Sequence, residues 1–159
     1  YHAGADVPKP YAKEKNAILM EFVGDTGTAA PPLSHISLER NEAKQLFERV
    51  VRNIEIMLAN DRIHGDLSAY NILYWEGDIK LIDFPQVVLP EANPASWRIF
   101  QRDVIRVCQY FSAQGVFCNE KELAADLWLS HGHKIFKEVE PKYLDPEKPE
   151  DRKAWEKQG

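Results

Sequence analysis

The sequence has little cysteine, no long apolar run and no excess of positive charge, and each absence excludes a class of protein. Its two cysteines among 159 residues, Cys108 and Cys118, fit neither a disulfide framework nor a zinc site, and a reducing cytoplasmic setting is expected. No apolar stretch reaches the ~20 residues of a membrane span, so we expect no membrane segment. Lys and Arg number 20 against 25 Asp and Glu, which argues against broad nucleic-acid binding.

The remaining composition is that of an ordinary globular domain, with 44% hydrophobic and 28% charged residues. In the first part of the chain, residues 16–23 are almost continuously apolar and predict a short strand. Residues 24–37 are rich in Gly, Thr, Pro and Ser and predict a loop. A helix is expected from an N-cap at Ser37 to about Asn60, because apolar residues recur there at spacings of three and four.

The second half predicts a hairpin followed by helices. Residues 71–75 and 79–83 have strand character, and Glu76-Gly77-Asp78 between them predicts a tight turn. A second amphipathic helix is expected from Ser96 until Gly115 ends it. Farther on, Asn119 with a glutamate three residues later matches the pattern that starts a helix.

Polar residues that suit phosphoryl transfer flank this predicted hairpin. Residues 64–71 read HGDLSAYN, and residues 81–85 read LIDFP. In phosphoryl transfer a carboxylate orients the attacking hydroxyl, while an asparagine and a second carboxylate hold magnesium ions. Asp66, Asn71 and Asp83 supply these groups in the order that kinase-fold enzymes use. The combined pattern therefore predicts a kinase fold, although each residue alone could be a loop or strand-end residue.

The details of these segments resemble the RIO family of atypical protein kinases, especially its first subfamily. The similarity rests on DLSAYN at 66–71 and IDFPQ at 82–86, and it extends over roughly residues 1–117. Residues 1–10 look like the family's segment before the hinge, and residues 19–25 look like the hinge. The resemblance implies an α+β fold, namely a kinase-like C-terminal lobe that is mostly helical with small β-hairpins, with the N-terminal lobe largely absent.

This resemblance also divides the chain. Residues 1–25 would be the end of the N-terminal lobe and the hinge, residues 26–133 the C-terminal lobe, and residues 134–159 a charged helix or tail. The family's phosphate-covering loop and phosphate-binding lysine precede the segment that starts here, and the sequence contains neither.

Roles for individual residues follow from the same resemblance. It implies that Asp66 is the catalytic aspartate, that Ser68 lies near the phosphates and that Tyr70 packs to hold the loop. Asp83 would bind magnesium and could also accept a phosphoryl group as a phospho-aspartate. The nucleotide would be bound by Met20 as gatekeeper, by backbone groups of Glu21 and Val23, and by Ile82 and Asn71, with Asn71 also a magnesium ligand.

The implied activity is that of a serine/threonine kinase or ATPase that uses ATP and Mg²⁺. Its partners would be a protein substrate bearing Ser or Thr and, as for eukaryotic and archaeal relatives, a pre-ribosomal particle. Two alternatives stay open. A small-molecule phosphotransferase of the aminoglycoside or choline kinase type shares the HGD motif, and a non-catalytic assembly module could use the same lobe as a surface.

Other conspicuous residues favour structural roles. His131 and His133 lack further ligands for a metal site and predict a solvated helix end. His64 is expected to be a structural loop residue that bonds to backbone near Asp83. Three tryptophans are expected to pack within the fold: Trp97, Trp128 and Trp155.

Overall fold

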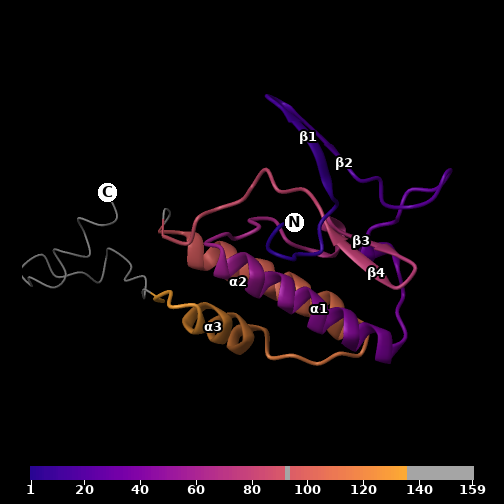
Figure 1. Ribbon diagram of the computed structural model, residues 1–159. Helices are drawn as coiled ribbons and strands as arrows, with labels where there is room; N and C mark the ends of the chain where they lie inside the picture. The colour runs from indigo at the N-terminus through magenta and orange to yellow at the C-terminus, as the bar shows by residue number, and fades with distance from the viewer. Residues whose placement is uncertain (92–93, 136–159) are drawn as a thin grey trace, which may run out of the picture.

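The computed structural model describes residues 1–91 and 94–135, and these residues form a mainly helical body with two small antiparallel sheets (Figure 1). This architecture confirms the predicted α+β, mostly helical fold. Across these ranges, no helix has both the length and the apolar character that a bilayer crossing demands. The α-helices are α1 (Arg40–Ala59), α2 (Ser96–Ala113) and α3 (Glu120–Ser130), and the short 3-10 helices are η1 (Leu33–His35) and η2 (Ala69–Asn71).

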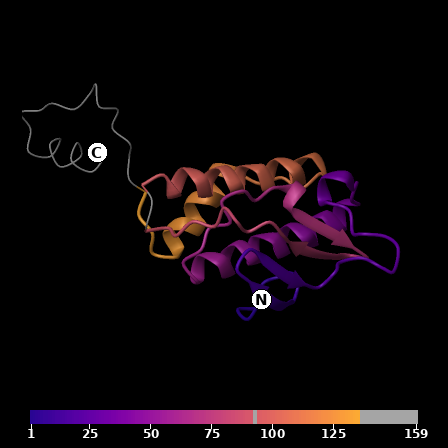
Figure 2. The same cartoon turned by 90° about the horizontal axis from the view of Figure 1, so that it is seen from above.

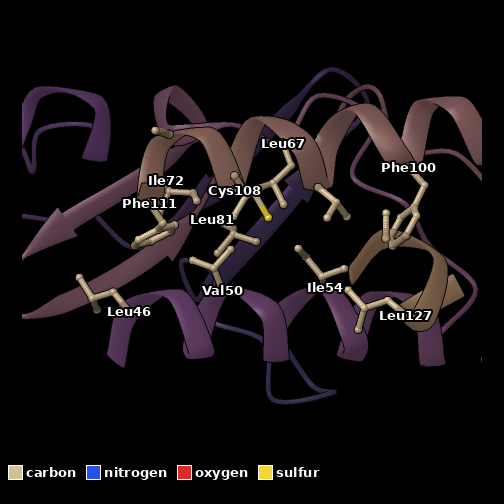
Figure 3. Packing of buried hydrophobic residues seen from close by; sticks show 14 of the residues in the cluster. Leu46, Val50, Ile54, Leu67, Ile72, Leu81, Phe100, Cys108, Phe111 and Leu127 are labelled. Atoms are coloured by element: carbon tan, nitrogen blue, oxygen red, sulfur yellow. The ribbon is translucent and has the colours of Figure 1, made fainter. Parts of the chain in front are cut away.

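The hydrophobic core lies between α1 and α2 (Figure 3). Leu46, Val50, Ile54 and Leu58 of α1 recur every fourth residue, so they share one face of the helix, and all four are buried. Seen from above, the hairpin of residues 72–81 lies at one end of the two helices and α3 lies toward the other (Figure 2). The predicted apolar face of the first helix is therefore confirmed.

The predicted start of α1 is wrong by two residues. Glu39, not Ser37, is the N-cap, and it makes no side-chain cap hydrogen bond. The preceding segment stays extended because α2 and its C-cap residue, Gln114, bind it. Leu38 N–H donates to Gln114 Oε1 at 2.9 Å, and Tyr110 Oη donates to the Ile36 carbonyl at 3.0 Å.

The predicted hairpin exists, with shorter strands than expected. Strand β3 (Ile72–Trp75) pairs with β4 (Asp78–Leu81) in the register Ile72 to Leu81. The turn residues Glu76 and Gly77 have φ values of 49° and 83°, as a two-residue type I′ turn requires. Asn71 instead ends η2, and Asp83 lies beyond the strand with a φ of 65°.

Another hairpin, the first in the chain, precedes α1, and only half of it was predicted. The strand expected over residues 16–23 is β2 (Ala17–Met20), and it pairs with β1 (Pro10–Glu14). Every residue of both strands is exposed, and the hairpin projects away from the helices (Figure 1).

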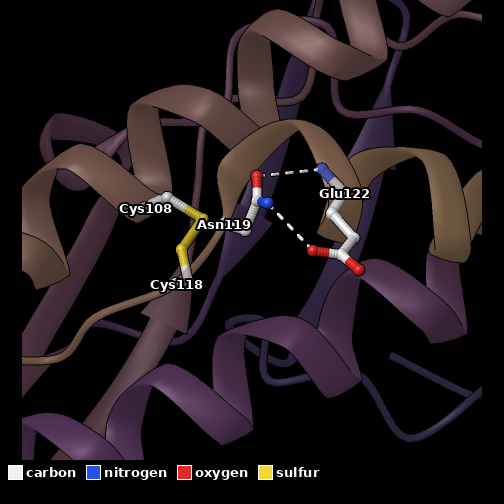
Figure 4. Close-up of a disulfide and its surroundings, with 4 residues drawn as sticks. All are labelled: Cys108, Cys118, Asn119 and Glu122. Atoms are coloured by element: carbon white, nitrogen blue, oxygen red, sulfur yellow. Dashed lines mark hydrogen bonds between the residues drawn. A yellow bond between two sulfur atoms is a disulfide. The ribbon is translucent and has the colours of Figure 1, made fainter.

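Cys108 and Cys118, which show no disulfide framework in the sequence, are nevertheless joined by a single disulfide that was not predicted (Figure 4). Cys108 lies on α2, and the chain reverses at Gly115, where φ is 85°. This reversal brings the two Cα atoms to 6.2 Å although the cysteines are ten positions apart in the sequence. A single pair offers no framework pattern in the sequence, and the pairing depends on where α2 ends.

The start of α3 follows the sequence prediction (Figure 4). Asn119 Oδ1 accepts from Glu122 N–H at 3.4 Å, while Asn119 Nδ2 donates to Glu122 Oε2 at 2.9 Å. Trp128 is buried in the core and Trp97 packs against it. The predicted charged segment 134–159, including Trp155, lies outside the described residues from position 136 onward.

Candidate active site

The loop that carries Asp66 lies against the segment after β4 because the backbone of both is paired. Ile63 and Val88 exchange two hydrogen bonds, at 2.8 and 3.0 Å. Gly65 allows the two segments to approach closely. Its φ is 86°, and a Cβ there would lie 2.1 Å from the carbonyl oxygen of Gln86. Only glycine fits this position without a backbone shift.

His64 joins the same two segments from within the core. Its Nδ1 accepts from Asp66 N–H at 3.3 Å, so the ring proton is on Nε2, which donates to the Ile82 carbonyl at 2.9 Å. The ring also packs on Phe84, with centroids 4.7 Å apart. The structural role predicted for His64, a bond to backbone near Asp83, is confirmed.

Asp103 of α2 supports the Asp66 loop from below. Its side chain is 4% exposed, and its Oδ2 accepts from Gly65 N–H at 2.9 Å. Burial raises the pKa of this carboxyl above its usual range, opposed by the hydrogen bond from Leu67 N–H and by Arg102. No role was predicted for Asp103. The sequence feature that could have indicated one is its position, because Asp103 is a lone acid on the apolar face of the helix, four residues from both Ile99 and Val107.

Asp66 lies beside Asn71, as the kinase pattern requires. Asn71 Nδ2 donates to the Asp66 carbonyl at 2.8 Å and, weakly, to Asp66 Oδ2 at 3.4 Å. The other carboxylate oxygen of Asp66 accepts from Arg106 of α2 at 2.9 Å, a contact that the sequence analysis did not predict. The carboxylate is therefore held on both sides while 45% of its side chain stays exposed.

Ser68 and Tyr70 have local roles in this loop. Ser68 Oγ accepts from Tyr70 N–H at 3.3 Å and so caps η2. The Tyr70 side chain is 70% exposed, so the expectation that it packs to hold the loop is wrong. The buried anchors of the loop are Leu67 and Ala69 instead.

A cleft of about 1170 Å³ lies between the first hairpin and the segment after β4. It is large enough for a nucleotide-sized ligand. Asp66 and Ser68 are not among the residues that line it. Six other predicted site residues do line it: Met20, Glu21, Val23, Asn71, Ile82 and Asp83.

The backbone of this cleft has polar groups available to a ligand. Within the described part of the chain, neither the Glu21 carbonyl nor the Val23 N–H makes a backbone hydrogen bond, although the adjacent Glu21 N–H bonds to Lys9 and the Val23 carbonyl bonds to Ala30. Asp83, with a φ of 65°, holds a left-handed conformation that is strained for a non-glycine residue. Such strain concentrates at functional sites.

The donor set near Asp83 suits magnesium better than zinc. Asn71 commits its Nδ2 to Asp66, which leaves Oδ1 for a ligand, and the Asp83 side chain is exposed. Among residues 1–91 and 94–135, no group of three or more His, Cys, Asp or Glu could hold a metal. One amide oxygen and one carboxylate fit Mg²⁺, which takes few protein ligands and completes its shell with phosphate oxygens and water.

The histidine pair after α3 differs in part from the prediction. His133 is buried and packs on Trp128, with ring centroids 4.7 Å apart, so it is not at a solvated helix end. His131 binds the end of its own helix, through a contact of 2.8 Å between Nδ1 and the Leu127 carbonyl. Both histidines therefore have structural roles.

Comparison with known proteins places this geometry in a family. The RIO domain family profile (RIO1) matches residues 1–123. The serine/threonine-protein kinase rio1 of Schizosaccharomyces pombe is 33% identical over 118 residues, which are 73% of this chain and 24% of that protein. The RIO-type serine/threonine-protein kinase Rio1 of Methanocaldococcus jannaschii is 31% identical over 119 residues, covering 74% of this chain and 40% of that protein.

A solved structure supports the fold independently. The Rio2 kinase-ADP/Mg²⁺-phosphoaspartate complex from Chaetomium thermophilum superposes with a TM-score of 0.60 at 21% identity, over 99% of this chain and 50% of that one. The chain thus spans half or less of the length of these three proteins. From the family match, the sequence identity and the shared fold together, the chain belongs to the RIO domain family.

Proposed function

We propose that this chain binds Mg²⁺ and ATP in the cleft and transfers the γ-phosphate to a serine or threonine of a protein. One observation carries the proposal. The cleft gathers Met20, Glu21 and Val23 opposite Asn71 and Asp83, and Asn71 is hydrogen-bonded to Asp66. The relatives named serine/threonine-protein kinases support the same activity.

The adenine would lie against the first hairpin. The Glu21 carbonyl can accept from an amino group of the base, and the Val23 N–H can donate to a ring nitrogen. Met20 and Ile82 provide apolar contacts on the two sides of the cleft. Ser68 would lie near the phosphates. A mostly apolar site with a few fixed polar groups is typical of nucleotide pockets.

The phosphates would be held at the Asp83 side of the cleft. Bound magnesium would neutralise the charge that develops on the transferred phosphoryl group. Asn71 Oδ1 and the Asp83 carboxylate are the residues that would hold it. Asp66 would accept a hydrogen bond from the attacking hydroxyl and orient it, while Asn71 and Arg106 fix the carboxylate.

A second route uses Asp83 itself as the acceptor. A carboxylate oxygen of Asp83 would form a bond to the γ-phosphorus as the bond to the β–γ bridging oxygen breaks, which releases ADP and leaves a phospho-aspartate. Water would then hydrolyse this acyl phosphate. The Rio2 kinase of Chaetomium thermophilum, solved as a phosphoaspartate complex, supports this route by analogy.

Phosphoryl transfer from labelled ATP tests the proposal. We expect label on a serine-containing protein or on the chain itself, and its loss in Asp66→Ala with the fold unchanged. Asp126→Ala, at an exposed carboxylate of α3, is the matched control and should retain transfer. Asp83→Asn should remove any hydroxylamine-labile label. Full turnover by Asp66→Ala would contradict the assignment.

The resemblance also implies a cytoplasmic location and action on a pre-ribosomal particle, and both belong to the proposal. The disulfide between Cys108 and Cys118 argues against a cytoplasmic location, because disulfides are rare in reducing compartments. Thiol titration of the freshly isolated denatured protein checks it. Two reactive thiols would agree with a reducing compartment, and none would favour an oxidising one.

A further inference from the structure

The exposed face of α2 carries a row of arginines, which we call the α2 arginine row: Arg98, Arg102 and Arg106. They are spaced by four residues, so they share one side of the helix, and all three are exposed. The one acidic residue of α2, Asp103, is buried beneath them. The row therefore gathers three guanidinium groups on one surface of a chain whose net charge is −5. Two of them already face a carboxylate, because Arg102 pairs with Asp103 at 3.2 Å and Arg106 pairs with Asp66 at 2.9 Å.

This row begins at the catalytic loop. Arg106 Nη1 donates to Asp66 Oδ1 at 2.9 Å, and Arg102 Nη2 donates to the Gly65 carbonyl. The side chains of Arg102 and Arg106 are nevertheless 44% and 41% exposed. A guanidinium has five N–H donors. Arg106 can therefore hold a second carboxylate without leaving Asp66.

We propose that the α2 arginine row binds a carboxylate-rich segment of the protein substrate and so directs an adjacent serine or threonine to Asp66. The inference rests on the proposed function, because it takes Asp66 as the residue that meets the hydroxyl. Arginine suits this task, since its planar fork matches a carboxylate.

The helix geometry defines the spacing of the acids. Four residues of α-helix rise about 6 Å, and an extended peptide advances about 3.3 Å per residue. Acidic side chains at alternate positions of the substrate therefore match successive arginines. They lie on one side of the acceptor residue, because the row extends from Asp66 toward the N-terminus of α2.

Peptide binding tests this inference without requiring phosphoryl transfer. The probes are labelled serine peptides with Asp at alternate positions, before or after the serine, and the same peptides with Asn. Fluorescence anisotropy with the whole chain gives each dissociation constant. One of the Asp peptides should bind roughly tenfold more tightly than its Asn counterpart, as two or three exposed ion pairs allow. This preference should fall as salt is raised.

Charge reversal identifies the surface. Arg98→Glu and Arg102→Glu should each remove most of the preference for Asp. Arg52→Glu, at an exposed arginine of α1, should keep it. Arg102→Glu could also disturb the loop, because Arg102 bonds to Gly65. Arg98 lies one turn farther from the loop, so the effect of Arg98→Glu on the preference for Asp tests the row without that complication.

Three results would overturn the inference: equal binding of Asp and Asn peptides, a preference that survives both reversals, or an RNA oligonucleotide that outcompetes the Asp peptide at the row.

A separate titration with Mg²⁺ and ATP keeps the two proposals apart. If the chain does not bind nucleotide but still prefers the Asp peptide, the proposed function is refuted and the acidic-peptide site stands. If the chain binds nucleotide but shows no preference for the Asp peptide, only the arginine row is refuted.

Discussion

The two hairpins of this chain each contain an apolar strand, but they lie in opposite environments. In the second hairpin Ile72, Ile79 and Leu81 are at most 1% exposed, whereas Ile18 and Leu19 of the first are 55% and 64% exposed. Both segments are apolar enough to predict a strand. Burial depends instead on the elements that cover each hairpin, and α1 and α2 cover only the second. The first hairpin adds little to the core and much to the wall of the cleft.

A polar attachment holds the chain just before the first hairpin to the helical body. Arg49 donates to both carboxylate oxygens of Asp6 at 2.8 Å, and Asn53 donates to Asp6 Oδ2 at the same distance. Asp6 N–H bonds to Asn53 Oδ1 at 2.6 Å, and Leu81 N–H donates to the Asp6 carbonyl at 2.7 Å. Charged, bidentate contacts of this kind fix geometry as well as adding stability.

Truncating one apolar side chain in each region should give the largest contrast. Phe111→Ala in the core is expected to lower the free energy of unfolding by about 3–5 kcal/mol, because the side chain is fully buried. Leu19→Ala in the first hairpin should change it by less than about 0.5 kcal/mol. Denaturant titration measures both. Similar losses would contradict the division into a packed body and an uncovered hairpin.

Alanine substitutions at two glycines separate the cost of a backbone collision near Asp66 from the cost of a left-handed conformation. Gly65 and Gly77 have φ values of 86° and 83°, but only at Gly65 would a Cβ collide with backbone. Gly77→Ala should cost about 1–2 kcal/mol, the penalty of the left-handed conformation. Gly65→Ala should cost clearly more and displace the Asp66 loop. Equal unfolding free energies would show that the contact with Gln86 is unimportant.

The Asp6 attachment should make stability depend on acid pH. The hydrogen bond from Arg49 is the largest influence on Asp6, and it lowers the pKa of this carboxyl despite its burial. The carboxylate therefore stabilises the fold above its usual pKa of about 4, and this contribution disappears as the pH falls through the lowered value. Asp6→Asn should cost about 1–2 kcal/mol at neutral pH and flatten the acid limb of the stability curve.

The matched control for Asp6→Asn is Asp61→Asn, at an exposed aspartate of the turn after α1. Its acid limb should match that of the unchanged chain. If Asp6→Asn retained the full acid dependence, other carboxyls would be responsible for it.

Sequence patterns predicted the features that depend on neighbouring residues in the chain. The HGDLSAYN and LIDFP segments, the turn at Gly77 and the face of α1 follow from short-range patterns, and the structure has each of them. The contacts that complete the site join residues far apart in the chain. Arg106 with Asp66 spans 40 positions, Asp103 with Gly65 spans 38 and Asp6 with Arg49 spans 43. No periodicity indicates such pairs, and β1 was missed because its residues are not apolar enough to stand out.

Titration of ATP into the chain by calorimetry, with and without Mg²⁺, is the most direct test of the central claim that the cleft is a nucleotide site. We predict binding that requires Mg²⁺ and weakens by about tenfold or more in Asp83→Asn, the loss expected from removing a charged ligand. Asp126→Asn, on α3, should bind as the unchanged chain does. Binding of equal strength without Mg²⁺ and in Asp83→Asn, or no binding at all, would contradict the account.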